Sequence, residues 1–208
     1  MKKSIKGIIF DYGCVISTKF DEKEAEEICL ILGLEKDSFY KIYYAIRPEY
    51  DKGALNTQEY WRKIAGEYNI FLSEEEIERL KELDIKGWTV IDEKMLSFIK
   101  ETRKNISKMA ILSNMPSDIL EYLEKSFEWL NLFDTLVFSC NPGINKPDRE
   151  IYMICLERLG LAPEECVFID DTEWNIQAAE KLGLNTILYK SFDEFKLEFI
   201  QISPLLYI

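Results

Sequence analysis

Short and almost continuous runs of apolar residues recur along the two outer parts of the chain. The runs lie at Ile5 to Phe10, Met109 to Leu112, Leu136 to Phe138, Val167 to Ile169 and Thr186 to Tyr189. Each run is too short for a helix, and none shows a sustained alternation of apolar and polar positions. Runs of this kind are typical of strands that are covered on both faces of a parallel sheet.

The segments between these runs have apolar residues at the three- and four-residue spacing of helices. Two such patterns lie at Leu120, Leu123, Phe127 and Leu130, and at Ile151, Ile154, Cys155 and Leu159. Pro116 and Pro147 suit first-turn positions of helices, whereas Gly160 and Gly183 suit helix ends. The alternation of strands and helices predicts an α/β fold with a doubly wound, Rossmann-like parallel sheet.

The stretch from Thr18 to Gly87 lacks strand-like runs and shows helical patterns only. Its apolar residues form four stripes, at Ala25, Ile28, Cys29 and Leu32; at Phe39, Ile42, Tyr43 and Ile46; at Tyr60, Trp61, Ile64 and Tyr68; and at Ile77 and Leu80. We expect Pro48 to end the second helix, and Ser73 with Glu76 to form a capping box that opens the fourth. We therefore predict an all-helical cap at residues 18–87, inserted into an α/β core of residues 1–17 and 88–208.

The composition narrows the possible chemistry. The chain has 208 residues and no histidine, which excludes a Ser-His-Asp or Cys-His nucleophile, a His-ligated zinc site and a histidine pH switch. Its 26 Lys and Arg against 38 Asp and Glu give a net charge of −12, and it lacks the basic face of a nucleic-acid binder. An anionic substrate therefore needs local positive charge from a metal ion, a lysine or helix N-termini.

Cysteine usage and hydropathy predict a cytoplasmic protein without a membrane partner. The five cysteines are odd in number and lack CxxC spacing, which fits a reducing compartment. The first apolar run stops at Asp11, too early for a signal peptide, and no run approaches the ~20 residues of a membrane span. The apolar residues Leu205, Leu206 and Tyr207 suit either an edge element or a contact between subunits, so the oligomeric state stays open.

Polar residues follow the predicted strands at the edge where ligands bind in open parallel sheets. Asp11, Ser113 and the pair Asp170 and Asp171 come directly after apolar runs, and Lys146 lies in the loop after the third run. Taken singly, such an Asp is usually a turn former or a helix cap, and such a lysine is usually solvated. Two adjacent carboxylates, however, repel each other unless a cation lies between them. Together these residues predict an Mg²⁺ site that handles phosphate.

Four segments together resemble the motifs of the haloacid dehalogenase superfamily. They are Ile8 to Ile16; Leu112 to Asn114; Asn145 to Pro147; and Phe168 to Asp171 with the following Asn175 to Ala179 and Lys181 to Gly183. The resemblance covers essentially the whole chain, because the predicted cap follows the first motif, where this superfamily has its C1-type cap. It implies a hydrolase. Most members are phosphatases, and dehalogenases and phosphoglucomutases are minorities.

The resemblance implies a role for each matching residue. Asp11 would be the nucleophile that takes the phosphoryl group as an aspartyl-phosphate. Ser113 and the amide of Asn114 would hold phosphate oxygens. Lys146 would offset the negative charge of the nucleophile before attack and of the phosphate during it, which agrees with the repulsion expected between two anions.

The resemblance also implies the metal and the reaction. Mg²⁺ would be held by Asp11, by the backbone carbonyl of Gly13 and by Asp171, with Asp170 close behind, and which of the two adjacent acids binds the metal directly stays open. The implied function is Mg²⁺-dependent hydrolysis of a small phosphorylated metabolite, with sugar phosphates as one candidate. A small-molecule substrate is the only partner that this function requires.

One position departs from the usual pattern. Phosphatases of this superfamily commonly have a second Asp two residues after the nucleophile, as general acid and base, and this chain has Gly13 there. General acid catalysis contributes about 10²–10⁴-fold. We therefore expect a preference for phosphates with good leaving groups, such as anomeric sugar phosphates or acyl phosphates. Some members that look like sugar-phosphate phosphatases also have Gly at this position.

Three other interpretations stay open. A 2-haloacid dehalogenase also lacks the second Asp, but it uses no metal and does not normally have two adjacent acids in the fourth motif. A response-regulator receiver combines similar groups, but its acidic pair precedes the phosphorylated Asp and it has no helical insertion. The third is a non-catalytic, phosphate-binding regulatory protein, because a fold does not guarantee activity.

Two further sets of residues are candidates for the site. Cys14, three residues after Asp11, is either a small residue that packs in a tight turn or a redox-sensitive thiol. On the predicted cap, Arg47, Tyr50 and Lys52 either face the substrate or are solvated surface residues.

Overall fold

The computed structural model describes residues 4–203, and within them a five-stranded parallel sheet forms the centre of the fold. The strands are β1 (Gly7–Phe10), β2 (Lys108–Ser113), β3 (Thr135–Phe138), β4 (Cys166–Asp170) and β5 (Asn185–Leu188), in the order β3-β2-β1-β4-β5. Each strand begins and ends within two residues of a predicted apolar run, so the predicted parallel sheet is confirmed. Leu205, Leu206 and Tyr207, for which an edge element or a subunit contact was predicted, lie outside the described residues.

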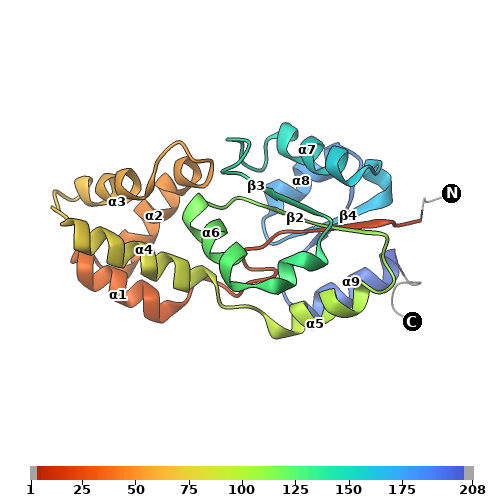
Figure 1. The fold of residues 1–208 in the computed structure, drawn as a ribbon, viewed down its shortest axis with the longest axis horizontal. Coiled ribbons are helices and arrows are strands. Elements are labelled where there is room, and N and C mark those ends of the chain that lie inside the picture. The colour runs from red at the N-terminus through yellow and green to blue at the C-terminus, as the bar shows by residue number, and fades with distance from the viewer. Residues whose placement is uncertain (1–3, 204–208) are drawn as a thin grey trace.

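Helices cover both faces of this sheet (Figure 1). On one face lie α5 (Glu93–Thr102), α6 (Ser117–Ser126), the 3₁₀ helix Glu128–Leu132 and α9 (Phe192–Ile202); on the other lie α7 (Arg149–Leu159) and α8 (Glu173–Lys181), with the short 3₁₀ helix Pro163–Glu165 leading into β4. Side chains alternate along β1. Ile8 and Phe10 pack in the hydrophobic cluster with α5, α6 and α9, and Ile9 packs in the cluster with α7 and α8. This two-sided burial explains the absence of polar alternation in the strand sequences.

The register of the strands brings their carboxyl ends to one edge of the sheet. Phe10 pairs with Ile111 of β2 and with Ile169 of β4. Because all strands point the same way, Asp11 after β1, Ser113 at the end of β2 and Asp170 at the end of β4 reach the same edge.

Four helices between β1 and α5 form a unit with its own core, seen at one end of the molecule in Figure 1. They are α1 (Glu22–Leu32), α2 (Lys36–Asp51), α3 (Thr57–Gly66) and α4 (Glu74–Trp88). Fully buried side chains hold this four-helix unit together, among them Ile28, Phe39, Tyr43, Trp61, Ile64 and Leu80. The predicted capping box of Ser73 and Glu76 is present at the start of α4.

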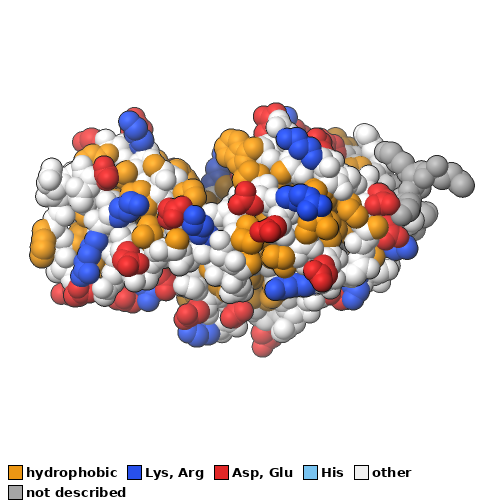
Figure 2. Space-filling view, turned by 90° about the horizontal axis from the view of Figure 1, so that it is seen from above, with side chains coloured by type: hydrophobic (Ala, Val, Ile, Leu, Met, Phe, Trp, Pro, Cys, Tyr) orange, Lys and Arg blue, Asp and Glu red, His pale blue; other side chains and the backbone are white. Residues whose placement is uncertain are grey.

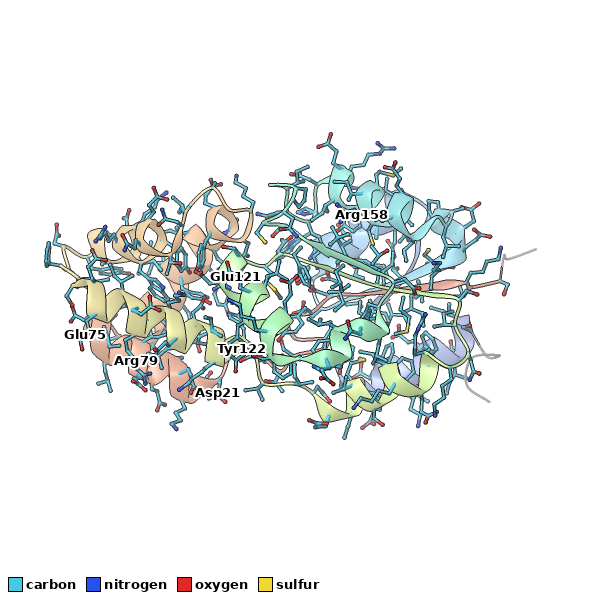
Figure 3. All side chains as sticks on the ribbon, in the orientation of Figure 1. Asp21, Glu75, Arg79, Glu121, Tyr122 and Arg158 are labelled. Atoms are coloured by element: carbon cyan, nitrogen blue, oxygen red, sulfur yellow. The ribbon has the colours of Figure 1, made fainter. Side chains whose placement is uncertain are left out.

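Two short segments connect the four-helix unit to the sheet, and they run side by side. Ser17 and Ile91 form an antiparallel bridge, in which the Thr18 N–H donates to the Val90 carbonyl at 2.8 Å and the Asp92 N–H donates to the Ile16 carbonyl at 2.9 Å. On the outer side of the unit, Arg79 of α4 donates to Glu27 of α1 at 2.9 Å (Figure 3).

No helix of the described residues is long and apolar enough to span a bilayer.

The prediction that Pro48 ends the second helix was wrong, because α2 continues to Asp51. The proline removes one N–H donor, but contacts with the core hold the turn that follows. The Asn145 side-chain amide donates to the Pro48 carbonyl at 2.7 Å, and the Ser139 hydroxyl donates to the Asp51 carbonyl at 2.5 Å. These bonds dock the last turn of α2 onto the loops that follow β3.

Three local predictions near helix ends also differ from the structure. Pro116 is the N-cap of α6 rather than a first-turn residue, and Pro147 follows a cis peptide bond and precedes the N-cap Asp148 of α7. The helix predicted through Leu130 ends at Ser126, because Phe127 is extended, with φ −130°, and the chain then enters a 3₁₀ turn. The apolar spacing continued across this break, so the pattern alone did not reveal it. The left-handed end at Gly160, with φ 69°, is as predicted.

The packing of α4 against Phe20 gives a prediction about stability. A Cβ atom at Gly87 would lie 2.8 Å from Cδ2 of Phe20 and closer still to the far edge of the ring, and Phe20 is only 5% exposed. We therefore expect Gly87→Ala to lower the free energy of unfolding by about 1–3 kcal/mol through overpacking, although alanine is the better helix former.

Gly66 of α3 is the matched control, because a Cβ atom there meets nothing within 4 Å. Gly66→Ala should raise the free energy of unfolding by about 0.5–1 kcal/mol. Urea denaturation of the two variants measures both effects, and equal stability of the variants would contradict the predicted contact.

Candidate active site

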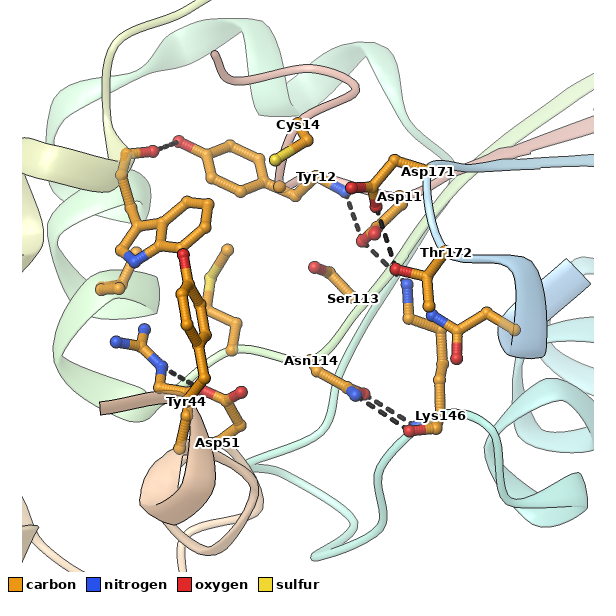
Figure 4. Close-up of a pocket in the computed structure, with 16 residues that line it drawn as sticks. Asp11, Tyr12, Cys14, Tyr44, Asp51, Ser113, Asn114, Lys146, Asp171 and Thr172 are labelled. Carbon is orange, nitrogen blue, oxygen red and sulfur yellow. Dashed lines mark hydrogen bonds and ion pairs between the residues drawn. The ribbon is translucent and has the colours of Figure 1, made fainter. Parts of the chain in front are cut away.

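A cavity of about 350 Å³ lies between the four-helix unit and the carboxyl edge of the sheet (Figure 4). Seen from another side, the surface is notched between the two parts of the molecule (Figure 2). The cavity is lined by Asp11, Tyr12, Gly13, Cys14, Tyr44, Arg47, Asp51, Trp88, Ser113, Asn114, Met115, Ile119, Lys146, Asp171, Thr172 and Asn175. The predicted site residues therefore meet in one place, except for Asp170, which lies behind the lining.

A buried ammonium group joins the ends of β1 and β4. Lys146 Nζ lies 2.8 Å from Asp11 Oδ1 and 2.6 Å from Asp170 Oδ2, and the lysine side chain is 1% exposed. The Tyr12 N–H donates to Asp11 Oδ1 at 2.7 Å, which fixes the carboxylate at the edge of the sheet. One oxygen each of Asp11, Asp170 and Asp171 lies within 4.8 Å of the others.

Burial and charge act in opposite directions on these groups. Burial raises the pKa of Asp11 to about 7, and the Asp170 carboxylate adds to this, while the neighbouring Lys146 lowers it. For Lys146, burial would lower the pKa, but the two carboxylates outweigh burial and raise it. The lysine is therefore held as a cation, and the three carboxylates of Asp11, Asp170 and Asp171 have more negative charge than this one cation offsets.

The two adjacent acids have different surroundings. Asp170 is fully buried, and it accepts hydrogen bonds from Lys146 Nζ, from the Thr172 N–H at 2.8 Å and from the Asn175 amide at 3.1 Å. Asp171 lines the cavity and accepts from the Thr172 hydroxyl at 3.2 Å. Asp171 is thus the acid whose carboxylate faces the cavity.

Asn114 and Lys146 hold each other through two hydrogen bonds. The Lys146 N–H donates to Asn114 Oδ1 at 2.7 Å, and the Asn114 side-chain amide donates to the Lys146 carbonyl at 3.0 Å. The side chain of Asn114 therefore positions the loop that carries the lysine, and its backbone N–H takes no part in these two bonds. Ser113 is 2% exposed and also lines the cavity (Figure 4).

Trp88 of α4 occupies the space beside Gly13. A Cβ atom at position 13 would lie 3.5 Å from Cζ3 of the Trp88 ring. The ring is fixed, since Trp88 Nε1 donates to the Tyr43 hydroxyl at 2.8 Å and the Tyr12 hydroxyl donates to the Trp88 carbonyl at 2.9 Å. An aromatic surface therefore borders position 13.

Several cavity residues were not predicted. Asn175 was noted only as part of a motif, yet it donates to Asp170, while its own Oδ1 is buried without a partner among residues 4–203. Its place five residues after Asp170, in the first turn of α8, was the available signal. Tyr44 carried no signal beyond the helical pattern, and Asp51 lies after Pro48, where that pattern was expected to end.

Of the three cap candidates, only Arg47 lines the cavity. Tyr50 donates through its hydroxyl to Asp118 of α6 at 2.6 Å, and Lys52 pairs with Glu49 at 2.7 Å. We call the side chains that the four-helix unit contributes to the cavity, which are Tyr44, Arg47, Asp51 and Trp88, the cap wall.

Cys14 lines the cavity in a left-handed turn, with φ 58°. Burial raises the pKa of its thiol to about 12, and the nearby Asp171 and Asp11 add to this. Since the thiolate is the reactive form, the structure favours the interpretation of Cys14 as a packing residue over that of a redox-sensitive thiol.

Comparison with known proteins identifies relatives with both phosphatase and dehalogenase names. The family model for the haloacid dehalogenase-like hydrolases matches residues 5–183. The phosphorylated carbohydrates phosphatase of Thermotoga maritima is 34% identical over 93 residues, which are 44% of this chain and 41% of that protein. The (S)-2-haloacid dehalogenase 4A of Burkholderia cepacia is 33% identical over 79 residues, 38% of this chain and 34% of that protein. The chain thus spans less than half the length of these curated relatives.

Among solved structures, the haloacid dehalogenase family enzyme BT-2542 of Bacteroides thetaiotaomicron has the same fold. It superposes with a TM-score of 0.77 at 22% identity, covering 95% of this chain and 99% of that chain. At this level of identity the likeness concerns the fold alone.

The charge balance at Lys146 gives a prediction for stability and pH. Lys146→Met leaves buried carboxylates without their cation, so we expect a loss of about 3–5 kcal/mol in the free energy of unfolding near pH 8. In the folded variant, the pKa of Asp11 should rise above the wild-type pKa of about 7, while the pKa of Asp11 in the unfolded chain stays near 3.8. The folded variant then binds a proton that the unfolded chain releases, and its stability recovers as the pH falls from about 8 to about 5.

Lys52→Met is the control, because Lys52 forms a partly exposed pair with Glu49 and its loss should change stability by less than about 0.5 kcal/mol. Urea denaturation in metal-free buffer at the two pH values measures both variants. A deficit of Lys146→Met that stays constant with pH would contradict the assigned charge balance.

Proposed function

Because the chain belongs to the haloacid dehalogenase-like hydrolase family, we propose that it is a metal-dependent phosphatase that hydrolyses a small phosphorylated metabolite. The observation that carries this proposal is the buried Lys146, which lies between Asp11 and Asp170 while Asp171 adds a third carboxylate at the cavity. Phosphoryl transfer to a carboxylate requires a nucleophile, a fixed cation and further negative charge that can bind a metal ion. This cavity combines all three.

The donor set fits Mg²⁺. Oxygen ligands are those that Mg²⁺ prefers, and the three carboxylates meet within 4.8 Å of one another. The Oδ1 of Asn175, which has no hydrogen-bond partner within residues 4–203, lies beside Asp170 and is a further acceptor in the same place. The related enzyme BT-2542 has been solved in complex with magnesium and inorganic phosphate. We propose that Asp11, Asp171 and the backbone carbonyl of Gly13 hold the ion, with Asp170 behind them as the partner of Lys146.

The proposed reaction has two steps on Asp11. A carboxylate oxygen of Asp11 attacks phosphorus, and the bond from phosphorus to the leaving-group oxygen breaks; water then attacks the aspartyl-phosphate, releases phosphate and restores the carboxylate. When bound, Mg²⁺ supplies positive charge that offsets the repulsion between the carboxylate and the phosphate. Lys146 does the same from the other side, and the Ser113 hydroxyl and the Asn114 N–H hold phosphate oxygens.

The surroundings of Gly13 support a preference for good leaving groups. Residue 13 is a glycine, so it has no carboxylic acid that could protonate the departing oxygen. The space beside it borders the Trp88 ring. Phosphates whose leaving group is stable as an anion lose least from this absence.

Two alternatives are less well supported by the site. A 2-haloacid dehalogenase needs no metal, and the cluster of Asp11, Asp170 and Asp171 has more negative charge than Lys146 alone offsets. A non-catalytic phosphate-binding protein does not require a fixed nucleophile, whereas Asp11 is held by both Lys146 and the Tyr12 N–H. The receiver interpretation does not fit a chain of this family.

We further propose that residues 18–87 act as a cap domain on a core of residues 1–17 and 88–208. The separate core of the four-helix unit and the paired connections at Ser17 and Ile91 support this division. The cap would close the substrate cavity against water, and the only partner that this function needs is a small phosphorylated molecule.

Asp11→Asn tests the proposed function. We expect hydrolysis of p-nitrophenyl phosphate to require Mg²⁺, to stop with a chelator, and to fall at least about a thousandfold in the variant, because an amide oxygen is a poor nucleophile. Acid-quenched wild-type protein should carry a phosphoryl group on the peptide that contains Asp11, as detected by mass spectrometry.

The exposed Asp37 of α2 provides the control for this test, since Asp37→Asn makes the same chemical change outside the cavity. Its activity should equal that of the wild type. Retention of wild-type activity in Asp11→Asn would overturn the proposed function.

A pair of matched substrates tests the leaving-group preference. p-Nitrophenyl phosphate and p-nitrobenzyl phosphate have similar shapes, but only the first releases a stabilised anion. We expect kcat/KM to be at least about a hundredfold higher for the first, in line with the usual contribution of a general acid. Values within about tenfold of each other would show that another group supplies the proton.

A further inference from the structure

The cap wall places an ion pair opposite the proposed phosphate end of the cavity. Arg47 Nε donates to Asp51 Oδ1 at 2.7 Å, and both side chains, about one-tenth exposed, line the cavity. Both residues lie in the last turns of α2, and Figure 4 shows Asp51 beside Tyr44, across the cavity from Asp11.

The guanidinium of Arg47 is already neutralised. Its Nη1 lies 2.8 Å from Asp84 Oδ1 and 3.0 Å from Asp84 Oδ2, and the same nitrogen contacts the Tyr43 hydroxyl. The group also lies over the Tyr43, Tyr50 and Trp88 rings, with 5.1, 5.5 and 5.9 Å from Cζ to the ring centroids. One cation therefore faces the two carboxylates of Asp51 and Asp84, so the cap wall together with the buried Asp84 has a net negative charge and Arg47 is not a free cation.

Asp51 retains an acceptor for a ligand. The hydrogen bond from Arg47 uses Oδ1, and within residues 4–203 no hydrogen bond uses Oδ2 of Asp51. The backbone of Asp51 is fixed by the core, because the Ser139 hydroxyl donates to its carbonyl and accepts from the Met115 N–H at 2.9 Å. The carboxylate thus has a defined position relative to the end of β2.

We propose that Asp51 determines specificity by accepting a hydrogen bond from a hydroxyl of an uncharged leaving group and by repelling any leaving group that carries a second anion. This inference rests on the proposed phosphatase function. The cavity of about 350 Å³ is at the small end of ligand sites, so a leaving group of monosaccharide size whose phosphate lies at Asp11 extends to the cap wall. Tyr44, beside Asp51 in Figure 4, and Trp88 also line the cavity, and aromatic rings suit the apolar face of a cyclic polyol.

Two sugar phosphates that differ in one group test the proposal. Glucose 1-phosphate and glucuronic acid 1-phosphate share the anomeric phosphate, but the second has a carboxylate in place of a hydroxymethyl group. We expect the wild type to favour glucose 1-phosphate in kcat/KM by about tenfold or more. Asp51→Asn should reduce this ratio at least about tenfold, by lowering the value for the neutral sugar and raising that for the acidic one.

Glu49→Gln is the matched control, because it also removes one carboxylate from α2, while Glu49 pairs with Lys52 and does not line the cavity. Its substrate ratio should equal that of the wild type. p-Nitrophenyl phosphate, which has no hydroxyl to offer, serves as the reference for an intact catalytic site in each variant.

The outcomes separate the two proposals. Hydrolysis of p-nitrophenyl phosphate by Asp51→Asn with an unchanged sugar ratio overturns the role of Asp51 and leaves the phosphatase function intact. Should Asp51→Asn fail to fold, the wild type decides, since equal kcat/KM for the two sugar phosphates overturns the role of Asp51. Absence of Mg²⁺-dependent hydrolysis of every phosphate ester by the wild type overturns both.

Discussion

The structure depends on one balance of charge at the carboxyl edge of the sheet. Parallel strands bring Asp11 and Asp170 together, and in a buried place two carboxylates repel each other strongly. Lys146, 2.8 Å from one and 2.6 Å from the other, makes the arrangement possible. The lysine is in turn held by its backbone bonds to the Asn114 side chain. The ends of β1, β2 and β4 and the loop before α7 are thus joined through one residue, Lys146, whose ammonium group contacts Asp11 and Asp170 and whose backbone contacts Asn114.

The sheet and this edge were predictable from the sequence because both depend on local rules. A strand buried on both faces contains few polar residues, so the first polar residue after the strand marks the edge of the sheet. Asp11 after Phe10 is an example. Convergence of Asp11, Ser113 and Asp170 follows from the common direction of the strands and needs no knowledge of side-chain packing. The alternating sides of Ile8 and Ile9 show how the same short run serves two hydrophobic clusters.

Apart from Arg47, the opposite wall of the cavity was not predicted, because contacts between distant segments determine it. The last turn of α2, which continues beyond Pro48, accepts hydrogen bonds from Ser139 and Asn145, which are 88 and 97 residues away from their partners. Asp51 lies in that turn and was missed with it. The division of roles between Asp170 and Asp171 likewise depends on three donors that surround Asp170, and no spacing along the chain encodes them.

The bridge between Ser17 and Ile91 has an evolutionary consequence. The chain leaves the sheet and returns to it at one point, so the intervening helices add no constraint on the distance between β1 and α5. Closing a longer or shorter insertion at such a junction changes the loop entropy only slowly with length. Residues of these helices can therefore diverge without displacing the carboxyl edge of the sheet.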